Sequence, residues 1–360
     1  MGHGVKSSEA RAKNFVPPLP EMPKRVLINL TTICNLKCPF CFLHGSEDER
    51  ARVKHGSMTE DQARQIIDEI APSRPIVQPN LWSEPLLAKH LAEHIAYMKE
   101  RGIAVCMNTN GLTLTEKMAQ SFVDMKMDTV FFSVDAMTRP TYQKIRGVDQ
   151  LEKLNNKVEL LLKVRGAATY PRIGVTLTQT CDNEAEVADF VAYWTKRVDV
   201  VRIGLVTEKG LGFHIEVDEP RIPCPLLYDS MSIQVNGDVS ICCQDSLGEY
   251  TVGNVFTDGG VKAVWHGEKF NRLRKLHEEG RFDEEPLCAK CNIWAGQVFT
   301  EETKDGILIR RSSQYTYYNR VDRMGSWTRE ETELAQSPAS EGAATSAMSP
   351  GGVAVQLGSK

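Results

Sequence analysis

Three closely spaced cysteines could hold an iron–sulfur cluster. Cys34, Cys38 and Cys41 follow the spacing C-x3-C-x2-C in the segment TTICNLKCPFC at 31–41. Three thiolates can ligate three irons of a four-iron cluster and leave the fourth iron open to another group. An open metal position is where chemistry can take place, so this spacing predicts redox or radical chemistry. Phe40 stands between the last two cysteines and could shield such a cluster from water.

A zinc site or a set of buried thiols is the alternative for this loop. Zinc sites usually use four ligands in C-x2-C pairs or with a paired histidine. His44 is close to the triplet, but it lies on the same loop and lacks an H-x3–5-H partner. We therefore favour the iron–sulfur interpretation.

A second set of cysteines lies near the C-terminal side. Cys224, Cys242, Cys288 and Cys291 could supply four thiolates to a closed cluster suited to electron transfer. A structural zinc with the same four ligands stays open from spacing alone. The remaining cysteines, Cys106 and Cys181, are expected as packed thiols, although Cys106 could face the interior of the fold.

The elements that position these residues alternate between β-branched runs and amphipathic stretches. Strands are predicted over 26–31, 76–81, 103–108, 129–133, 172–178 and 200–206, and helices over 59–71, 88–101, 115–125, 149–165 and 183–197. Thr59 and Gln62 fit a capping box at the start of the first helix. This alternation predicts an α/β fold with a parallel sheet, a partial (β/α)6 barrel short of the eight repeats of a complete one. The cysteine triplet follows the first strand, where α/β enzymes place their chemistry.

The pattern changes after about residue 218. Strands over 231–235 and 239–243 flank Asn236-Gly237, a hairpin signal, and a helix is predicted over 261–278. We divide the chain into an N-terminal strap (1–24), the barrel (25–217), a small auxiliary unit (218–300), a lid or packing segment (301–328) and a disordered tail (329–360). The auxiliary unit is too small to bury much core, and a metal would make up the shortfall.

Composition excludes several classes of function. The chain of 360 residues has 43 basic and 47 acidic residues and a formal net charge of -4, which gives no basic footprint for nucleic acid. Its apolar runs are too short to span a membrane, and no secretory signal precedes residue 25. A cytoplasmic location is expected, where cysteines are metal ligands or reactive thiols rather than disulfides.

The ordered motifs resemble those of the radical S-adenosylmethionine (SAM) superfamily over about 25–206. The cysteine triplet with Phe40 is the family signature, and Trp82-Ser83-Glu84-Pro85 resembles its Gly-Gly-Glu-Pro element with Trp-Ser in place of Gly-Gly. The resemblance implies a [4Fe-4S] cluster on Cys34, Cys38 and Cys41, with SAM on the open iron. It also implies that Glu84 meets the methionine ammonium and Arg146 the carboxylate. Further cofactor contacts are implied at Asn110, Ser133 and Asp135, and at the main chain near Val175 and Leu177 for the adenine.

The C-terminal cysteines resemble the auxiliary-cluster extension called SPASM, in its shortened twitch form. Matching elements are GDVSICC at 237–243, VGN at 252–254, Trp265 and the final C-x2-C. The likeness implies one auxiliary [4Fe-4S] cluster on Cys224, Cys242, Cys288 and Cys291. Neighbouring residues of a strand point to opposite faces, so Cys243 is expected to point away from that cluster.

Several reactions fit this inventory. Twitch units occur in 2-deoxy-scyllo-inosamine dehydrogenase and neomycin C epimerase, so a sugar, aminoglycoside or cyclitol-like small molecule is the expected substrate. Cys243 favours an epimerase in which its thiol returns a hydrogen atom to a carbinol carbon, although a buried core thiol is the plain alternative. A dehydrogenase, a peptide-modifying enzyme and a simple electron carrier are the rivals. A flavodoxin or ferredoxin is expected as electron donor.

Overall fold

Six parallel strands form the centre of the molecule. The computed structural model describes residues 5–10, 15–53, 55–206, 217 and 220–326. The central strands are β2 (Arg25–Ile28), β3 (Ile76–Gln78), β4 (Ala104–Thr109), β5 (Thr129–Ser133), β6 (Arg172–Gln179) and β7 (Val200–Leu205). They lie side by side in chain order, each parallel to the next. The predicted partial (β/α)6 barrel is confirmed.

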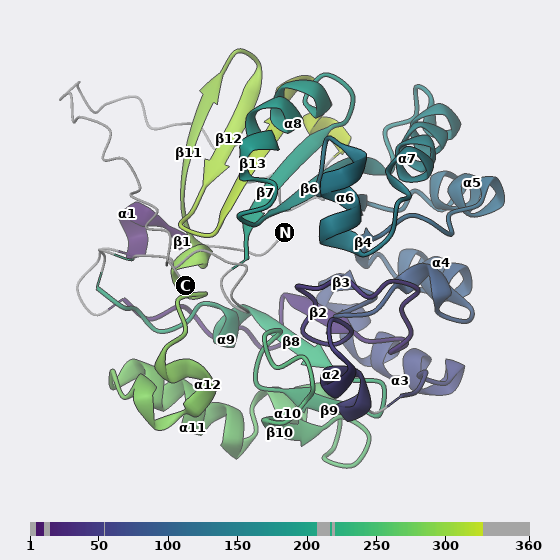
Figure 1. Ribbon diagram of the computed structural model, residues 1–360. Coiled ribbons are helices and arrows are strands. Elements are labelled where there is room, and N and C mark those ends of the chain that lie inside the picture. Colours follow the sequence, from purple (N-terminus) through teal and green to yellow (C-terminus); the bar gives the residue numbers. More distant parts are fainter. Residues whose placement is uncertain (1–4, 11–14, 54, 207–216, 218–219, 327–360) are drawn as a thin grey trace.

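Helices cover one side of these strands (Figure 1). They are α3 (Glu60–Ile70), α4 (Leu91–Glu100), α5 (Glu116–Asp124), α6 (Arg139–Arg146), α7 (Leu151–Arg165) and α8 (Val187–Trp194), and a further helix, α2 (Glu47–Arg52), follows the first cysteine loop. The capping box at Thr59 and Gln62 is present at the start of α3. The sequence did not predict α6, which lies with α7 between β5 and β6.

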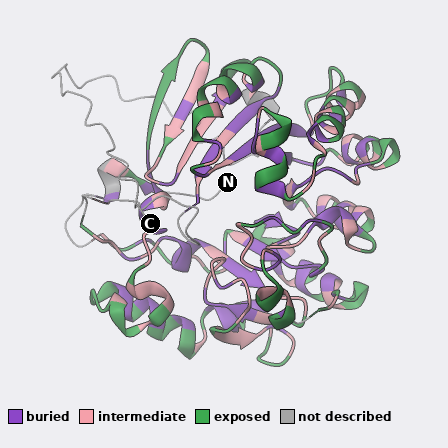
Figure 2. Ribbon diagram, viewed as in Figure 1, coloured by how far each residue is buried: buried purple, intermediate pink, exposed green. Residues whose placement is uncertain are grey.

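Side chains alternate between the two faces of the central strands, as the pleat of a strand requires. One valine from each of five strands joins the apolar core that the helices share: Val26, Val77, Val105, Val130 and Val201. The adjacent residues in the chain point the other way and line a cavity: Arg25, Gln78, Cys106, Phe131 and Arg202. Figure 2 shows the central strands as largely buried.

The C-terminal segment extends the sheet beyond β2. Strand β8 (Ser230–Ile233) pairs parallel to β2, and β9 (Asp238–Ser240) and β10 (Thr251–Asn254) follow in antiparallel order. The strand predicted over 239–243 is therefore too long, because β9 ends at Ser240. The helix predicted over 261–278 is also wrong in one respect, since it is two helices, α10 (Val261–Trp265) and α11 (Glu268–Glu278), separated near Gly267. Two further short helices are α9 (Leu226–Asp229) and α12 (Pro286–Ala289).

The other end of the sheet is extended beyond β7. Strands β11 (Val298–Lys304), β12 (Ile307–Arg311) and β13 (Tyr315–Arg320) form an antiparallel meander, and β13 pairs with β7. The segment expected as a lid or as packing is thus part of the sheet, and the boundary placed at residue 300 falls inside β11. The tail placed at 329–360 lies outside the described residues.

The N-terminal strap contacts the C-terminal part of the chain at two places. Strand β1 (Val5–Lys6) pairs parallel to β11 and is followed by α1 (Ser7–Ala10). Further along the strap, the carbonyl oxygen of Pro20 accepts a hydrogen bond from the indole of Trp265 in α10 (3.0 Å). Within the described ranges, we find no helix with the length and apolar character needed to cross a membrane.

Candidate active site

The first three cysteines lie on a tight loop between β2 and α2. The backbone N–H of Cys41 donates to the carbonyl of Cys38 (2.9 Å), and that of His44 donates to the sulfur of Cys41 (3.4 Å). A Cβ at Gly45 would come within 2.5 Å of the carbonyl oxygen of Cys41, so the turn requires glycine there. Burial raises the pKa of Cys34 to about 12, and the nearby charges of Glu84 and the other two cysteines add to the rise. A thiol at Cys34 that resists ionisation alone is suited to a cationic metal cluster, which would compensate the charge of its thiolate.

Glu84 lies beside this loop and is almost fully buried. Its carboxylate accepts hydrogen bonds from the Thr109 hydroxyl (2.5 Å), the Asn110 backbone N–H (2.7 Å) and the Leu86 backbone N–H (3.0 Å). A carboxylate offers about four acceptor positions, so one remains for an ammonium group. Burial raises the pKa of Glu84, which these hydrogen bonds partly offset.

Asn110 connects that segment to the first cysteine loop. Its side-chain amide donates to the side-chain oxygen of Asn35 (2.8 Å), one residue after Cys34. Its own side-chain oxygen accepts from the Leu112 backbone N–H (3.1 Å). The segment after β4 and the cluster loop after β2 are thus held together by side chains, as a shared cofactor site would require.

Arg146 and Asp135 form a buried ion pair behind the cysteines. The guanidinium of Arg146 pairs with the carboxylate of Asp135, donates to the sulfur of Cys38 (3.5 Å) and lies 5.4 Å from the centre of the Phe40 ring. Asp135 is fully buried and also accepts from the Thr178 backbone N–H (2.6 Å). Asp135 has no exposed surface, so we propose that it acts on the site by holding Arg146 rather than by touching SAM.

The remaining residues proposed around SAM divide between the two faces of the sheet. Ser133 ends β5 and pairs in register with Thr176 of β6. The side chains of Val175 and Leu177 are fully buried in the core that packs against the helices. Only their main chain is therefore available to a cofactor, and their contact with adenine stays a prediction.

Trp82 connects the first cysteine loop to the second cysteine set. Its indole N–H donates to the backbone carbonyl of Cys243 (2.9 Å), and its ring meets that of Phe42 edge to face with 5.3 Å between centroids. The sequence analysis treated this tryptophan only as a departure from Gly-Gly. This departure could have indicated a contact of Trp82 with another part of the chain, because a large indole stands where the family element has a glycine, which has no side chain.

Four of the later cysteines surround a small cavity in the C-terminal segment. Cys224, Cys242, Cys288 and Cys291 all line it, together with His277 and Arg221. Burial raises the pKa of Cys224 and of Cys288 to about 12, and the pKa of Cys242 well above its ordinary value. The charges of Cys288 and Cys291 add to the rise in the pKa of Cys224, and the charge of Cys291 adds to the rise at Cys288, so these residues lie near one another.

The arrangement fits a cluster better than a single zinc ion. Among the described residues, no three His, Cys, Asp or Glu side chains converge as ligands of one metal ion. Zinc requires four ligands about 2 Å from one centre, whereas a four-iron cluster places each cysteine on a different iron. The residues around this small cavity therefore fit a cluster that spreads its ligands.

Cys243 lies on the other side of this group. It lines a cavity of about 130 Å³ inside the partial barrel, whereas Cys242 lines the small cavity. The expected separation of the two sulfurs is present, but its reason is different, because both residues follow β9 in a turn and not in a strand. Burial raises the pKa of Cys243.

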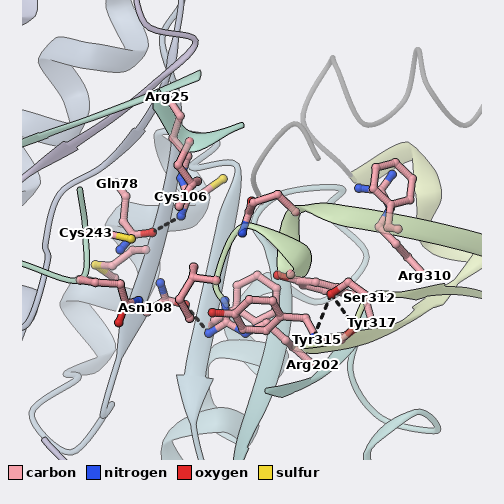
Figure 3. Close-up of a pocket in the computed structure, with 18 residues that line it drawn as sticks. Arg25, Gln78, Cys106, Asn108, Arg202, Cys243, Arg310, Ser312, Tyr315 and Tyr317 are labelled. Atoms are coloured by element: carbon pink, nitrogen blue, oxygen red, sulfur yellow. Dashed lines mark hydrogen bonds between the residues drawn. The ribbon is translucent and has the colours of Figure 1, made fainter. Parts of the chain in front are cut away.

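Figure 3 shows the residues that line the larger cavity. Polar side chains from four central strands are joined there by residues of the β11–β13 meander: Arg25, Gln78, Asn108, Arg202, Arg310, Ser312, Tyr315 and Tyr317, with Cys106 and Cys243. The sequence analysis missed all of these except the two cysteines. A signal existed in the inward positions of the strands, where a polar residue such as Gln78 or Arg202 interrupts an apolar run.

Comparisons with known proteins agree with the two cysteine sites. Residues 28–191 match the radical SAM superfamily, and residues 224–292 match the SPASM iron–sulfur cluster-binding domain. The matched SPASM segment includes all five later cysteines.

Relatives match the chain over different lengths. It is 28% identical over 176 residues to the tungsten-containing aldehyde ferredoxin oxidoreductase cofactor-modifying protein of Pyrococcus furiosus, which covers 47% of this chain and 48% of that protein. It is 22% identical over 336 residues to the mycofactocin maturase MftC of Mycobacterium tuberculosis, covering 77% of this chain and 80% of that protein. The chain spans about half or less of the length of the first curated relatives it matches.

Solved structures share the fold. The structure of native anSMEcpe with bound AdoMet and Cp18Cys peptide aligns with a TM-score of 0.55 and 16% identity, over 71% of this chain and 84% of that one. The matched segments hold the two cysteine sites on a partial barrel and its extension, the arrangement that SAM and iron–sulfur clusters require. The chain therefore carries a radical SAM domain over residues 28–191 and a SPASM iron–sulfur cluster-binding domain over residues 224–292.

Proposed function

We propose that this enzyme inverts a carbinol carbon of a small hydroxylated ring, with Cys243 as the hydrogen-atom donor. One observation carries the proposal: the side chain of Cys243 lines the large cavity inside the barrel, while the other four cysteines of the same segment line a separate one. A thiol that lines the cavity and is not needed as a ligand is available for chemistry on a substrate.

The reaction balances as a redox-neutral inversion. A cluster held by Cys34, Cys38 and Cys41 would, with SAM bound, supply a 5′-deoxyadenosyl radical able to remove one hydrogen atom from the substrate carbon. The thiol of Cys243 then gives a hydrogen atom to the opposite face of that carbon. The thiyl radical left on Cys243 returns to the thiol by taking up one electron and one proton. Each turnover therefore takes two electrons, one for SAM cleavage and one for Cys243, from a one-electron donor of the flavodoxin or ferredoxin class.

Oxidation to a ketone fits the cavity less well. A dehydrogenase needs a base for the hydroxyl proton. Among the described residues that line the cavity there is no Asp, Glu, His or Lys. Burial raises the pKa of Tyr315 to about 12, so its phenol is a poor base near neutral pH. This favours hydrogen return by a thiol over proton removal by a base.

The size of the cavity suits a single ring. Its volume of about 130 Å³ is similar to the roughly 150 Å³ of an engineered cavity that holds one benzene molecule. The side chains of Gln78 and Asn108 and the phenols of Tyr315 and Tyr317 can hydrogen-bond the hydroxyls of such a ring.

Peptide modification is the second candidate. The solved structure of anSMEcpe, which shares this fold, contains a bound peptide, so the fold can admit a peptide beside SAM. A side chain of such a substrate would have to enter the same cavity, next to Cys243.

Inversion and oxidation to a ketone can be distinguished by whether the product takes up hydrogen from the solvent. Reconstituted enzyme is incubated anaerobically in D2O with SAM, a reductant and a panel of cyclitols, sugars and oligosaccharides, and the products are examined by mass spectrometry. Because a thiol exchanges with solvent, inversion should add one deuterium at the changed carbon. A product two mass units lighter than the substrate would contradict inversion and assign the enzyme as a dehydrogenase.

A further inference from the structure

Two arginines of the large cavity have no carboxylate partner among the residues that the structure describes. We propose that Arg25 and Arg202 bind an anionic group, a carboxylate or a phosphate, on the ring substrate. This inference rests on the proposed function, since it names the chemical class of the substrate that enters the same cavity.

Arg25 begins β2 and points to the inner side of the sheet (Figure 3). One terminal nitrogen donates to the side-chain oxygen of Gln78 (3.1 Å), while its buried Nε has no hydrogen-bond partner. It forms no ion pair with a carboxylate of the described residues. A guanidinium has five N–H donors, so most of its capacity remains for a ligand.

Arg202 lies on β7 and reaches the same cavity from the opposite edge of the central strands. A terminal nitrogen donates to the side-chain oxygen of Asn108 (3.1 Å), and the guanidinium lies 5.0 Å from the centre of the Phe131 ring. These contacts fix the plane of the guanidinium without neutralising its charge. Asn108 and Phe131 are both neutral, and within the described part of the chain no acid pairs with this residue.

Tyr315 links the two arginines to Cys243. Burial raises the pKa of its phenol, the positive charges of Arg202 and Arg25 oppose the rise, and Cys243 adds to it. The phenol of Tyr315 therefore lies near enough to interact electrostatically with both guanidinium groups and with the proposed donor thiol. A ring with its anionic group between the arginines would place other carbons within the part of the cavity that Cys243 lines.

The charge balance of the cavity favours this class of ligand. Two cations in a partly dehydrated cavity are costly unless an anion compensates them. Arg310 also lines the cavity, but Glu301 pairs with it at 2.7 Å and its guanidinium stacks on Phe299 at 4.3 Å. The same surroundings repel the cationic aminoglycosides that the sequence analysis included among possible substrates.

Binding of three matched rings to the full-length reconstituted enzyme with SAM tests the proposal. The probes are myo-inositol, which is neutral, glucuronate, which carries a carboxylate, and inositol monophosphate, measured by anaerobic calorimetry. One charged ring or both should bind at least roughly tenfold more tightly than inositol, the scale of one charge-assisted hydrogen-bonded contact. The comparison of the two charged rings identifies a carboxylate or a phosphate as the preferred group.

Variants show whether the arginines cause the preference. Arg25→Gln and Arg202→Gln should each remove most of it, and Arg202→Lys, which keeps the charge but not the fork, should retain part of it. Arg310→Gln is the matched control and should change binding little, since that charge is already paired. Equal binding of all three rings, absence of binding, or an unchanged preference in both Arg→Gln variants would overturn the proposal. SAM cleavage to 5′-deoxyadenosine is assayed in parallel. Its loss would count against the proposed function rather than against the anion-binding role of the two arginines.

Discussion

Replacing Cys243 by alanine should leave SAM cleavage intact and abolish inversion of the substrate. The reductive step depends on the first cysteine loop, whereas Cys243 belongs to the large cavity and contributes only its backbone carbonyl to Trp82. Alanine keeps that carbonyl and removes the thiol. We expect 5′-deoxyadenosine at near the normal rate and a fall in inverted product on the order of a hundredfold or more, the scale of losing a positioned hydrogen-transfer group.

Two control variants make this result specific. Cys181→Ala removes an exposed thiol away from the cavity and should change nothing. Cys106→Ala removes the other thiol that lines the cavity, and it should retain inversion if Cys243 is the donor. Deuterium incorporation in D2O is the readout, and an unchanged labelled product from Cys243→Ala would remove this residue from the mechanism. Loss of the deuterium label in Cys106→Ala, and not in Cys243→Ala, would instead assign the role of hydrogen-atom donor to Cys106 of β4.

The double variant Cys288→Ala/Cys291→Ala should lose one of two clusters. Helix α12, which carries Cys288, has only four residues and buries none of them, so packing alone holds this segment weakly. A metal cluster that joins it to Cys224 and Cys242 would supply the missing stability, as metals do in small units. We expect iron to fall from about eight to about four per chain and the midpoint of thermal unfolding to drop.

Iron and sulfide analysis with electron paramagnetic resonance measures this change. The variant should retain the signal of a SAM-binding cluster, because Cys34, Cys38 and Cys41 are unaltered. Cys181→Ala again serves as the control with one cysteine fewer and no change in iron. Zinc in place of iron in the native protein, or an unchanged iron content in the double variant, would contradict an auxiliary iron–sulfur cluster at these residues.

Local patterns predicted most of the central fold. Strand β5 is predicted to the residue, and α3 begins at the capping box read from Thr59 and Gln62. Helix α6 was missed because it is short and mostly polar, with Pro140 in its first turn. The extensions of the sheet were missed for a different reason. The pairings of β8 with β2 and of β13 with β7 join strands about 100 residues or more apart, and no local pattern contains them.

The candidate site was predictable to the same limited extent. The spacing of Cys34, Cys38 and Cys41 predicted the first group of ligands, because it is a local property of the chain. The second group is spread over 224–291, and its prediction depended also on the resemblance to SPASM domains. The large cavity is not local, since Arg25, Arg202 and Tyr315 come from β2, β7 and β13. The segment 301–328 was predicted as a lid or as packing, and neither alternative placed its tyrosines on a strand paired with β7. The overall charge of -4 gave no sign of the arginines inside the cavity. A substrate class could be proposed only once the strands had brought those residues together.

Cleavage of SAM by the first cysteine loop is the most direct measurement. Protein reconstituted anaerobically with iron and sulfide and reduced with dithionite should convert SAM to 5′-deoxyadenosine and methionine, detected by liquid chromatography and mass spectrometry. The Cys38→Ala variant, prepared in the same way, should form none above background. Intact SAM after reduction of the native protein, or equal 5′-deoxyadenosine from Cys38→Ala, would contradict the assignment of radical SAM chemistry to Cys34, Cys38 and Cys41.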